Sequence, residues 1–250
     1  MQCVGYDSKV WIVSSWHGEY PNEENHEKIF IYDTITDIWS TKEGLPENRR
    51  RGGAASVEYK GEIYVSHGNR GGHGSHSTTY GWLDKYNIAE DRWITNLPTA
   101  PNPRDHTGGA IVLTTNGEHL LCVASGRNGG SDGFDDVVVE TDCFNLQTQQ
   151  WSTHASINQG RAGAAIGTTC DKKLMVAGGE GFGQAHSNVD VFDGITWTAF
   201  PSLRDPRHGT GLAFSCDCDQ VHIASGSGDQ GGGPELGTIE TLSVGGYACT

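Results

Sequence analysis

The sequence has no long hydrophobic run. No stretch reaches the roughly 18 consecutive apolar residues that a membrane-spanning helix needs, so no membrane span is predicted. Basic residues are also scarce, with 17 Lys and Arg against 31 Asp and Glu and a net charge of −14. A nucleic-acid partner would favour the opposite sign, so none is expected. The first residues show no signal-peptide pattern either.

Motifs for metal chemistry and helical periodicity are missing as well. The chain has no H-E-x-x-H pattern, and its seven cysteines include no C-x-x-C pair of the kind found in structural zinc sites. No segment keeps the 3.6-residue period of an amphipathic helix over ten residues. We therefore predict no cofactor, no metal and no catalytic residue, and we expect an all-β fold.

Glycine is abundant, with 36 in 250 residues, about twice the usual share of roughly 7%. The glycines follow no Gly-X-Y period and stand in clusters beside short apolar runs. This arrangement is typical of many tight turns between short strands.

Four tryptophans mark an internal repeat of about fifty residues. An aromatic residue followed by Asp or Asn precedes each of them by five to seven positions, as in Tyr32-Asp33 before Trp39. The four are Trp39, Trp93, Trp151 and Trp197. Arginine then follows each tryptophan by 10 or 11 residues, at Arg50, Arg104, Arg161 and Arg207. Two columns that keep step through unequal spacings indicate homologous repeats.

The segment after each arginine reads as strand, turn, strand and then a Gly-rich or Ser-Gly step. Lys173-Leu174-Met175-Val176 before Gly178-Gly179 is one copy. Each repeat thus offers about four short strands rich in β-branched and aromatic residues. Such a unit matches the four-stranded blade of a β-propeller.

This order of motifs resembles the kelch motif, and the whole chain is similar to the galactose oxidase/kelch superfamily. Phrases such as Arg104-Asp105-His106 and Pro206-Arg207-His208 resemble a subgroup of largely uncharacterised secreted kelch-repeat proteins. The resemblance implies a kelch-type β-propeller. It does not imply the copper chemistry of galactose oxidase, because the matching Tyr and Cys positions are not found here.

We expect one propeller domain over residues 1–250, in repeats of roughly 1–46, 47–101, 102–157, 158–203 and 204–250. The first and last repeats look incomplete. Either the two termini complete one shared blade, which gives five blades, or a sixth blade lies upstream, because an open ring would expose sheet edges.

The arginines and their neighbours form the main candidate ligand site. If the first strand of each blade is innermost, these side chains surround one mouth of the channel, where guanidinium groups suit carboxylate, sulfate or phosphate. The alternative is that the arginine column is a structural part of the repeat, which leaves specificity to Arg51, His106 and His208. The predicted ligand-binding set is Arg51, Arg104, His106, Arg161, Arg207 and His208.

Two loops and one glycine run carry weaker predictions. His67, His73 and His76 would hold a metal if their loop folded around it. Asp132, Asp135 and Asp136 offer oxygen ligands for calcium without the order of an EF-hand. In both cases a solvated loop is the expected reading. The run from 226 to 233 lacks the Lys-Ser/Thr of a phosphate-binding loop.

The cysteines allow three pairings. Cys122 and Cys143 fall on strands expected to be neighbours in one blade, and Cys170 aligns with Cys216 and Cys218 in the next repeat. A bond between Cys3 and Cys249 would join the ends. Because seven is odd, at least one cysteine is free or bonds outside the chain.

A binding or scaffolding module that engages a protein or an anionic glycan through its loop faces fits these observations best. One alternative is a carbohydrate-active enzyme with His106 and His208 as acid and base. Another is a structural subunit of an extracellular assembly that accepts a strand at the open blade. We expect an extracellular location.

Overall fold

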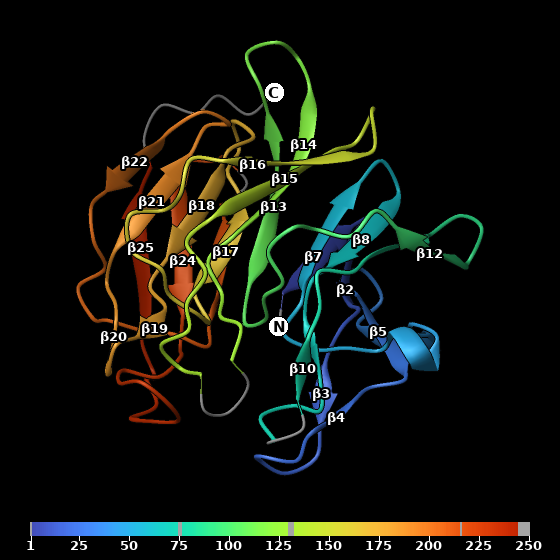
Figure 1. Ribbon diagram of the computed structural model, residues 1–250, viewed down its shortest axis with the longest axis horizontal. Helices are drawn as coiled ribbons and strands as arrows, with labels where there is room; N and C mark the ends of the chain where they lie inside the picture. Colours follow the sequence, from blue (N-terminus) through green and yellow to red (C-terminus); the bar gives the residue numbers. More distant parts are fainter. Residues whose placement is uncertain (1, 75–76, 130–132, 216, 245–250) are drawn as a thin grey trace.

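The computed structural model describes residues 2–74, 77–129, 133–215 and 217–244. Within these ranges the regular structure is β-strand apart from one short 3-10 helix, η1 (Glu47–Arg49). The strands form five antiparallel blades in sequence order, and the inner strand of each blade lies against that of the next (Figure 1). This confirms the kelch-type, all-β propeller with five repeats.

Each blade runs outward from its inner strand. Blade 1 consists of β1 (Cys3–Tyr6), β2 (Lys9–Ile12), β5 (Lys28–Asp33) and β6 (Ile38–Glu43). Blade 2 consists of β7 (Ala55–Tyr59), β8 (Glu62–Ser66), β11 (Leu83–Asn87) and β12 (Arg92–Leu97). Blade 3 consists of β13 (Gly108–Leu113), β14 (His119–Ala124), β15 (Thr141–Asn145) and β16 (Gln150–His154). Blade 4 consists of β17 (Ala165–Thr168), β18 (Leu174–Ala177), β21 (Val189–Phe192) and β22 (Trp197–Phe200), and blade 5 of β23 (Gly211–Phe214), β24 (Gln220–Ala224) and β25 (Ile239–Ser243).

The two end blades differ in completeness. Blade 5 has three strands within the described residues, in line with an incomplete last repeat. Blade 1 has four strands, and its inner strand β1 begins at Cys3. In blades 2 to 5 a segment with the framework arginine precedes the inner strand, and the described part of blade 1 contains no such segment. The inner strands β1 and β23 are largely exposed, whereas β7, β13 and β17 are mostly buried.

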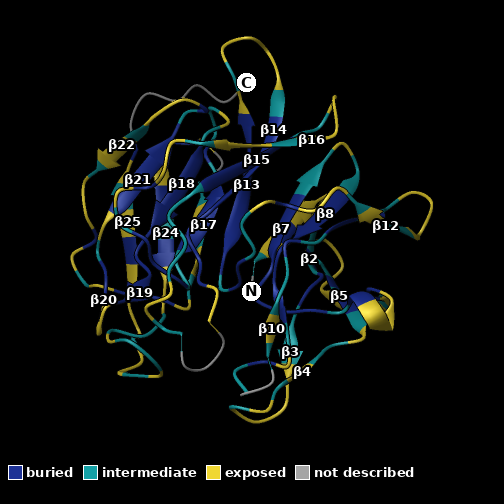
Figure 2. Cartoon of the chain, in the orientation of Figure 1, coloured by how far each residue is buried: buried dark blue, intermediate teal, exposed yellow. Residues whose placement is uncertain are grey.

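The hydrophobic core lies between successive blades. Four clusters of buried side chains each join two neighbours, blade 1 to 2 and so on to blade 5. The alternation of side chains along a strand makes this possible: Ile63 and Val65 pack toward blade 1, while Tyr64 packs toward blade 3. The buried inner strands and exposed loops are visible in Figure 2.

The tryptophan column lies on the outermost strands and joins each blade to the one before it. The indole N–H of Trp93 donates to the carbonyl of Glu43, that of Trp151 to Pro98, and that of Trp197 to Ala155, at 2.7–3.2 Å. The aromatic residue that precedes each tryptophan in the sequence packs against its ring, as Phe192 does against Trp197 with 5.2 Å between centroids. The repeated aromatic–Asp/Asn…Trp phrase is therefore one packing unit.

The Asp or Asn in that phrase closes the turn between the third and fourth strands. The Asp33 carboxylate accepts the backbone N–H groups of Ile35 and Thr36, and Asp193 does the same for Ile195 and Thr196. Short polar side chains favour such local bonds to the backbone. This explains why an acid or amide recurs at this point.

A second column holds each blade together from within. Arg161 donates to the Asp190 carboxylate at 2.7 Å and to the carbonyl of Gly178 at 2.6 Å, and its side chain has no exposed surface. Arg51, Arg104 and Arg207 make the equivalent bonds inside their own blades, with Asp84, Asp142 and Glu240 as the acids. Each guanidinium thereby connects the segment entering the inner strand to the second and third strands.

This geometry corrects the sequence alignment in blade 2. The framework position belongs to Arg51, which was assigned to ligand specificity, and not to Arg50. Arg50 is partly exposed and bonds through Nε to the carbonyl of Leu45. Burial lowers the pKa of Arg51 to about 10 against the attraction of Asp84, so its guanidinium stays charged at neutral pH.

Two of the predicted disulfides are present. Cys122 and Cys143 are directly opposite on β14 and β15 and are bonded. Cys170 is bonded to Cys218, which connects turns of blades 4 and 5. Cys216 and Cys249 lie outside the described residues, and Cys3 is exposed and bonds to no described cysteine. None of the described segments forms a helix long and apolar enough to cross a bilayer.

We predict that Arg161→Ala lowers the free energy of unfolding by about 3–5 kcal/mol, because Asp190 is then left buried without its cation. Arg50→Ala is the matched control and costs less than about 1 kcal/mol, as expected for a partly exposed group. Urea unfolding monitored by tryptophan fluorescence measures both. Equal losses in the two variants would contradict the assigned framework column.

Candidate functional site

The loops between the second and third strands gather at one end of the blades. We call this end the loop face and define it by the described residues 16–27, 69–74, 77–80, 127–129, 133–140, 180–187 and 226–238. Three of these loops begin as short ribbons, β3 (Trp16–His17) with β4 (Glu24–Asn25), β9 (Asn69–Arg70) with β10 (Thr78–Thr79), and β19 (Glu180–Gly181) with β20 (Gln184–Ala185). The ribbons lie at the lower end of the molecule in Figure 1.

The segment entering each inner strand reaches the same end. Single bridges pair it with the loop of its own blade, at Gly52 with Asn69, Asp105 with Arg127, Ala162 with Glu180 and His208 with Ser227. These pairs occupy equivalent positions in blades 2 to 5. Side chains at these positions vary from blade to blade, because the neighbouring framework arginine already bonds the buried carbonyls and the acid of its blade.

Blade 3 departs most from its neighbours. Where the other blades have Gly53, Gly163 and Gly209, all at φ between +62° and +66°, blade 3 has His106 at φ +49°. The left-handed conformation suits glycine and costs an ordinary residue about 1–2 kcal/mol. A non-glycine residue held there is a common feature of functional sites, so His106 is the first residue to examine.

His106 contacts a second histidine. Its Nε2 lies 2.9 Å from Nε2 of His73, which comes from the loop of blade 2. A carboxylate holds the other nitrogen of each ring: His73 Nδ1 lies 2.7 Å from Glu23 of blade 1, and His106 Nδ1 is bonded to Asp105. The result is a carboxylate–histidine–histidine–carboxylate chain across three blades.

The chain continues to the last two blades. Arg127 lies between the pair and blade 4, with Nη2 3.3 Å from His106 Nε2 and Nη1 3.4 Å from Glu180. Glu180 then accepts the backbone N–H of Gly231 in blade 5 at 2.8 Å, and it lies 3.6 Å from Nε2 of His208. Polar contacts thus link the loops of all five blades.

The hydrogen-bond partners fix the number of protons on the pair. Each Nδ1 faces a carboxylate and therefore carries a proton. The two Nε2 atoms share one more, because a contact of 2.9 Å between two nitrogens needs one donor and one acceptor. Arg127 also donates toward His106 Nε2, which makes His106 the acceptor and places the shared proton on His73.

The electrostatic environment agrees with this assignment. Burial, together with repulsion from Arg127 and His73, lowers the pKa of His106 against the attraction of Asp105. Burial alone would raise the pKa of Asp105 and of Glu23. The bond from the His106 ring outweighs burial at Asp105, and the bonds from the backbone N–H and then the ring of His73 contribute most to outweighing it at Glu23, so the pKa of both carboxyl groups is lowered. Both carboxylates are therefore charged at neutral pH.

Aromatic rings line one side of the pair. Trp16 of β3 lies 5.2 Å from His73 and 5.3 Å from His106 between ring centroids, and Tyr20 lies 5.1 Å from His73. Trp16 occupies space that Gly52 leaves open, since a Cβ on Gly52 would meet the indole at 2.1 Å. The indole N–H is buried and has no partner among the described residues.

The structure separates the predicted ligand-binding set into two groups. Arg51, Arg104, Arg161 and Arg207 are fully buried and engaged with acids and carbonyls of their own blades. The structural alternative expected this of Arg104, Arg161 and Arg207, whereas it left Arg51 to ligand specificity. His106 and His208 are both in the loop-face network, but Arg127 and Glu180 lie between them. Ligand binding by this set stays a prediction.

The histidine loop and the acidic loop, for which a metal site was the weaker prediction, have different environments. His67 is fully buried and bonded to Ser66, and burial lowers its pKa far enough to keep it uncharged. His76 and Asp132 lie outside the described residues. Asp135 accepts the N–H of Phe182, and a weaker bond from Gln230 joins the loops of blades 3 and 5. Within the described part of the chain, no three His, Cys, Asp or Glu side chains converge as a metal site.

Negative charge is concentrated on the loop face. The described residues of its five loops contain ten Asp and Glu residues and two arginines, Arg70 and Arg127. This difference corresponds to eight of the fourteen net negative charges of the chain. The loop face therefore attracts cationic ligands and repels anionic ones.

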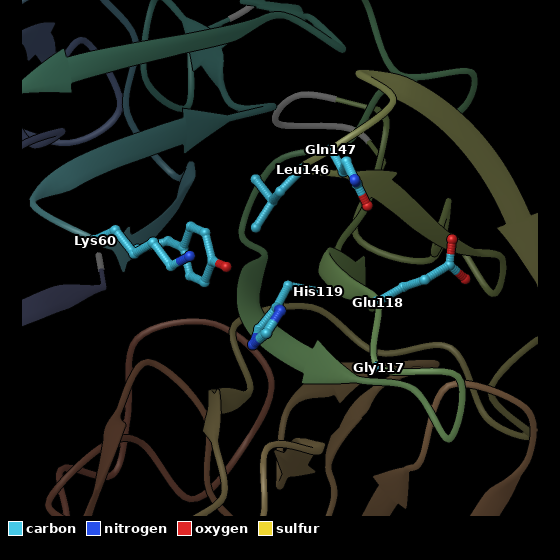
Figure 3. Close-up of a pocket in the computed structure, with 7 residues that line it drawn as sticks. Lys60, Gly117, Glu118, His119, Leu146 and Gln147 are labelled. Carbon is cyan, nitrogen blue, oxygen red and sulfur yellow. The ribbon is translucent and has the colours of Figure 1, made fainter.

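The opposite end carries a different feature. A pocket of about 350 Å³ lies between the turns of blades 2 and 3, lined by Tyr59, Lys60, Gly117, Glu118, His119, Leu146 and Gln147 (Figure 3). It is built from turn residues of mixed charge and contains none of the network described above. We assign it no role.

Sequence reasoning missed the framework acids and several members of the loop-face network. The acids Asp84, Asp142, Asp190 and Glu240 form a column two residues before the third-strand aromatic or leucine, a regularity visible in the repeats. Glu23, Arg127 and Glu180 follow no repeat pattern. The one signal in the sequence was the difference between repeats at His106, which stands where three other repeats have glycine. It points to the site and not to these three residues.

Comparison with known proteins identifies the repeat. No family model matches the sequence. The chain is similar to the Kelch-like protein terF of Aspergillus terreus, with 30% identity over 195 residues that cover 73% of this chain and 40% of terF. Its fold is similar to the solved structure of YjhT, with a TM-score of 0.67, 21% identity, and coverage of 90% of this chain and 72% of YjhT. The chain thus spans less than half the length of terF.

We predict that His106→Gly is more stable than His106→Ala by about 1 kcal/mol, because glycine relieves the left-handed backbone while both variants lose the ring. Thermal or urea unfolding measures the difference. Position 152 on the exposed strand β16 provides the control, and there Ser152→Gly is less stable than Ser152→Ala. The same order at both positions would show that His106 stores no backbone strain.

Proposed function

Because the chain belongs to the kelch-repeat β-propellers, a fold compatible with binding and scaffolding, we propose that it is a non-catalytic binding module that engages a basic protein surface through its loop face. The observation that carries this proposal is the concentration of acids there, ten against two arginines among the described residues. Electrostatic complementarity of this kind speeds encounter and selects partners.

Exposed aromatic side chains support a protein partner. Tyr20 in the loop of blade 1 is 65% exposed and Phe182 in the loop of blade 4 is 59% exposed. Large aromatic groups of this kind supply much of the energy at protein interfaces. The backbone N–H of Phe182 is bonded to Asp135 of the neighbouring blade, which fixes its position.

An anionic glycan has less support than the sequence suggested. That idea depended on a ring of arginines at the channel mouth, and these guanidinium groups are buried and paired with acids. A carbohydrate-active enzyme is the second candidate, favoured by the carboxylate-held histidine pair, which is suited to proton transfer. The two disulfides support an extracellular setting for either role.

The test uses a peptide array of graded charge together with neutral and sulfated glycans. We expect binding to Lys- and Arg-rich peptides, weakened by added salt. The triple variant Glu19→Gln, Glu24→Gln, Asp229→Asn removes three exposed loop-face acids and raises the Kd about tenfold. Isothermal titration calorimetry with the best peptide measures this change.

The matched control removes the same charge from the opposite end, with Asp7→Asn, Glu90→Gln and Glu118→Gln. It leaves the Kd within about twofold, because these acids lie more than a Debye length of roughly 8 Å from the loop face. Equal weakening by both triples would reduce the effect to net charge. Selective binding of sulfated glycans, or turnover of any glycan on the array, would overturn the proposal.

A further inference from the structure

We propose that the His73–His106 pair is a pH-dependent latch, which holds the loops of blades 1 and 2 to the segment entering blade 3 while it carries a single shared proton and releases them on acidification. As regulation of the loop face, this inference rests on the proposed function for its effect on binding. The latch itself is a property of the unliganded protein.

The contact between the rings tolerates only one protonation state. With one shared proton, one Nε2 donates and the other accepts across 2.9 Å. With a second proton, two N–H groups of two cationic rings face each other. With none, two lone pairs do. Both changes replace attraction by repulsion, so the contact between the two Nε2 atoms forms only over a limited range of pH. Acidification ends this range by adding the second proton.

Among the described residues, the surroundings of the pair provide no acceptor for the second proton. The groups that face the pair are Glu23 from the β3–β4 loop, Asp105 from the segment entering β13 and Arg127 from the loop after β14. Both carboxylates already accept a ring N–H, and Arg127 is a cation that opposes further positive charge. Thr79 occupies the remaining oxygen of Asp105 at 2.6 Å.

The latch connects directly to backbone structure. The N–H of His73 donates to the Glu23 carboxylate at 3.1 Å, so one loop is held to its neighbour by both ring and backbone of the same residue. The carbonyl of His106 accepts the N–H of Gly163 at 2.7 Å, which connects blade 3 to blade 4. Opening of the pair therefore exposes identifiable backbone amides.

The pair is also accessible to protons from solvent. The His73 side chain is 19% exposed and that of His106 is 16% exposed. Titration of the pair therefore needs no unfolding of the blades, whose framework arginines and cores lie elsewhere. Because the framework arginines and the cores do not take part in the contact, the loops can open without loss of the fold.

Hydrogen exchange of the unliganded protein between pH 7.5 and pH 5 tests the latch. After correction for the intrinsic exchange rate, protection of peptides covering 16–27 and 69–74 falls in acid by up to about tenfold per pH unit, the slope for uptake of one proton. Peptides from β14 in the core keep their protection. This second readout distinguishes opening of the loops from global unfolding.

The variant His106→Asn gives the decisive comparison. Asparagine tolerates the left-handed backbone, and its amide oxygen accepts the His73 N–H, but it takes up no proton. We expect the acid-dependent loss of protection to disappear in this variant and to persist in His119→Asn at the opposite end. Unchanged protection of the wild type down to pH 5, or the same acid response in His106→Asn, would overturn the latch.

The effect on binding is measured separately, with the basic peptide selected on the array. Acidification from pH 7.5 to pH 5.5 weakens its binding to the wild type more than to His106→Asn. If no peptide binds, the proposed function fails while the exchange result still decides on the latch. If the peptide binds equally at both pH values although exchange reports opening, the latch exists but does not regulate this face.

Discussion

A guanidinium group buried inside each of blades 2 to 5 holds together the segment entering the inner strand, the second strand and the third. Its charge is offset by one acid of the same blade, Asp84, Asp142, Asp190 or Glu240. Such a pair cannot lose one member cheaply, because the other would remain charged and buried. The residues beside the arginine carry no such constraint. Asp105 and His208 directly follow a framework arginine and His106 stands two residues after one, at positions where the side chain differs from blade to blade.

The separation between framework residues and their neighbours explains why the candidate site lies in the loop-face network. The framework repeats, so its members resemble one another from blade to blade. The loop-face network does not repeat: it uses two histidines, an arginine and acids drawn from different blades, and joins them into one line of contacts. His106 is the clearest case, since it accepts an unfavourable backbone conformation at a position that glycine fills in the other blades.

Much of the fold could be predicted from the sequence, because repetition supplies several copies of each constraint. The tryptophan column, the aromatic residues that pack on it and the Cys122–Cys143 bond followed from the order of strands. The choice between Arg50 and Arg51 could not be made from spacing, since the connections between repeats vary in length by more than one residue. Only the contacts with Asp84 and the second-strand carbonyls settle it.

The candidate site was less accessible to sequence reasoning. His73 and His106 are 33 positions apart in irregular loops, and no periodicity brings them together. The expectation of an arginine-lined mouth was reasonable for the residue type but ignored the need of buried carbonyls and acids for donors. A difference between repeats is the more informative signal at such sites, since a residue that replaces glycine in one repeat has an unfavourable left-handed backbone conformation.

The joining of successive blades through their hydrophobic cores has a consequence for how the molecule responds to change. Cores and indole bonds connect blade 1 to 2, 2 to 3 and onward, as in a linear array whose energy is a sum of nearest-neighbour terms. A disturbance in such an array decays along it. The line of polar contacts across the loop face crosses those interfaces and joins residues of successive blades. At the loop end the polar contacts run from Glu23 of blade 1 to Gly231 of blade 5, so a charge change at His106 in the third blade alters contacts on both sides of it.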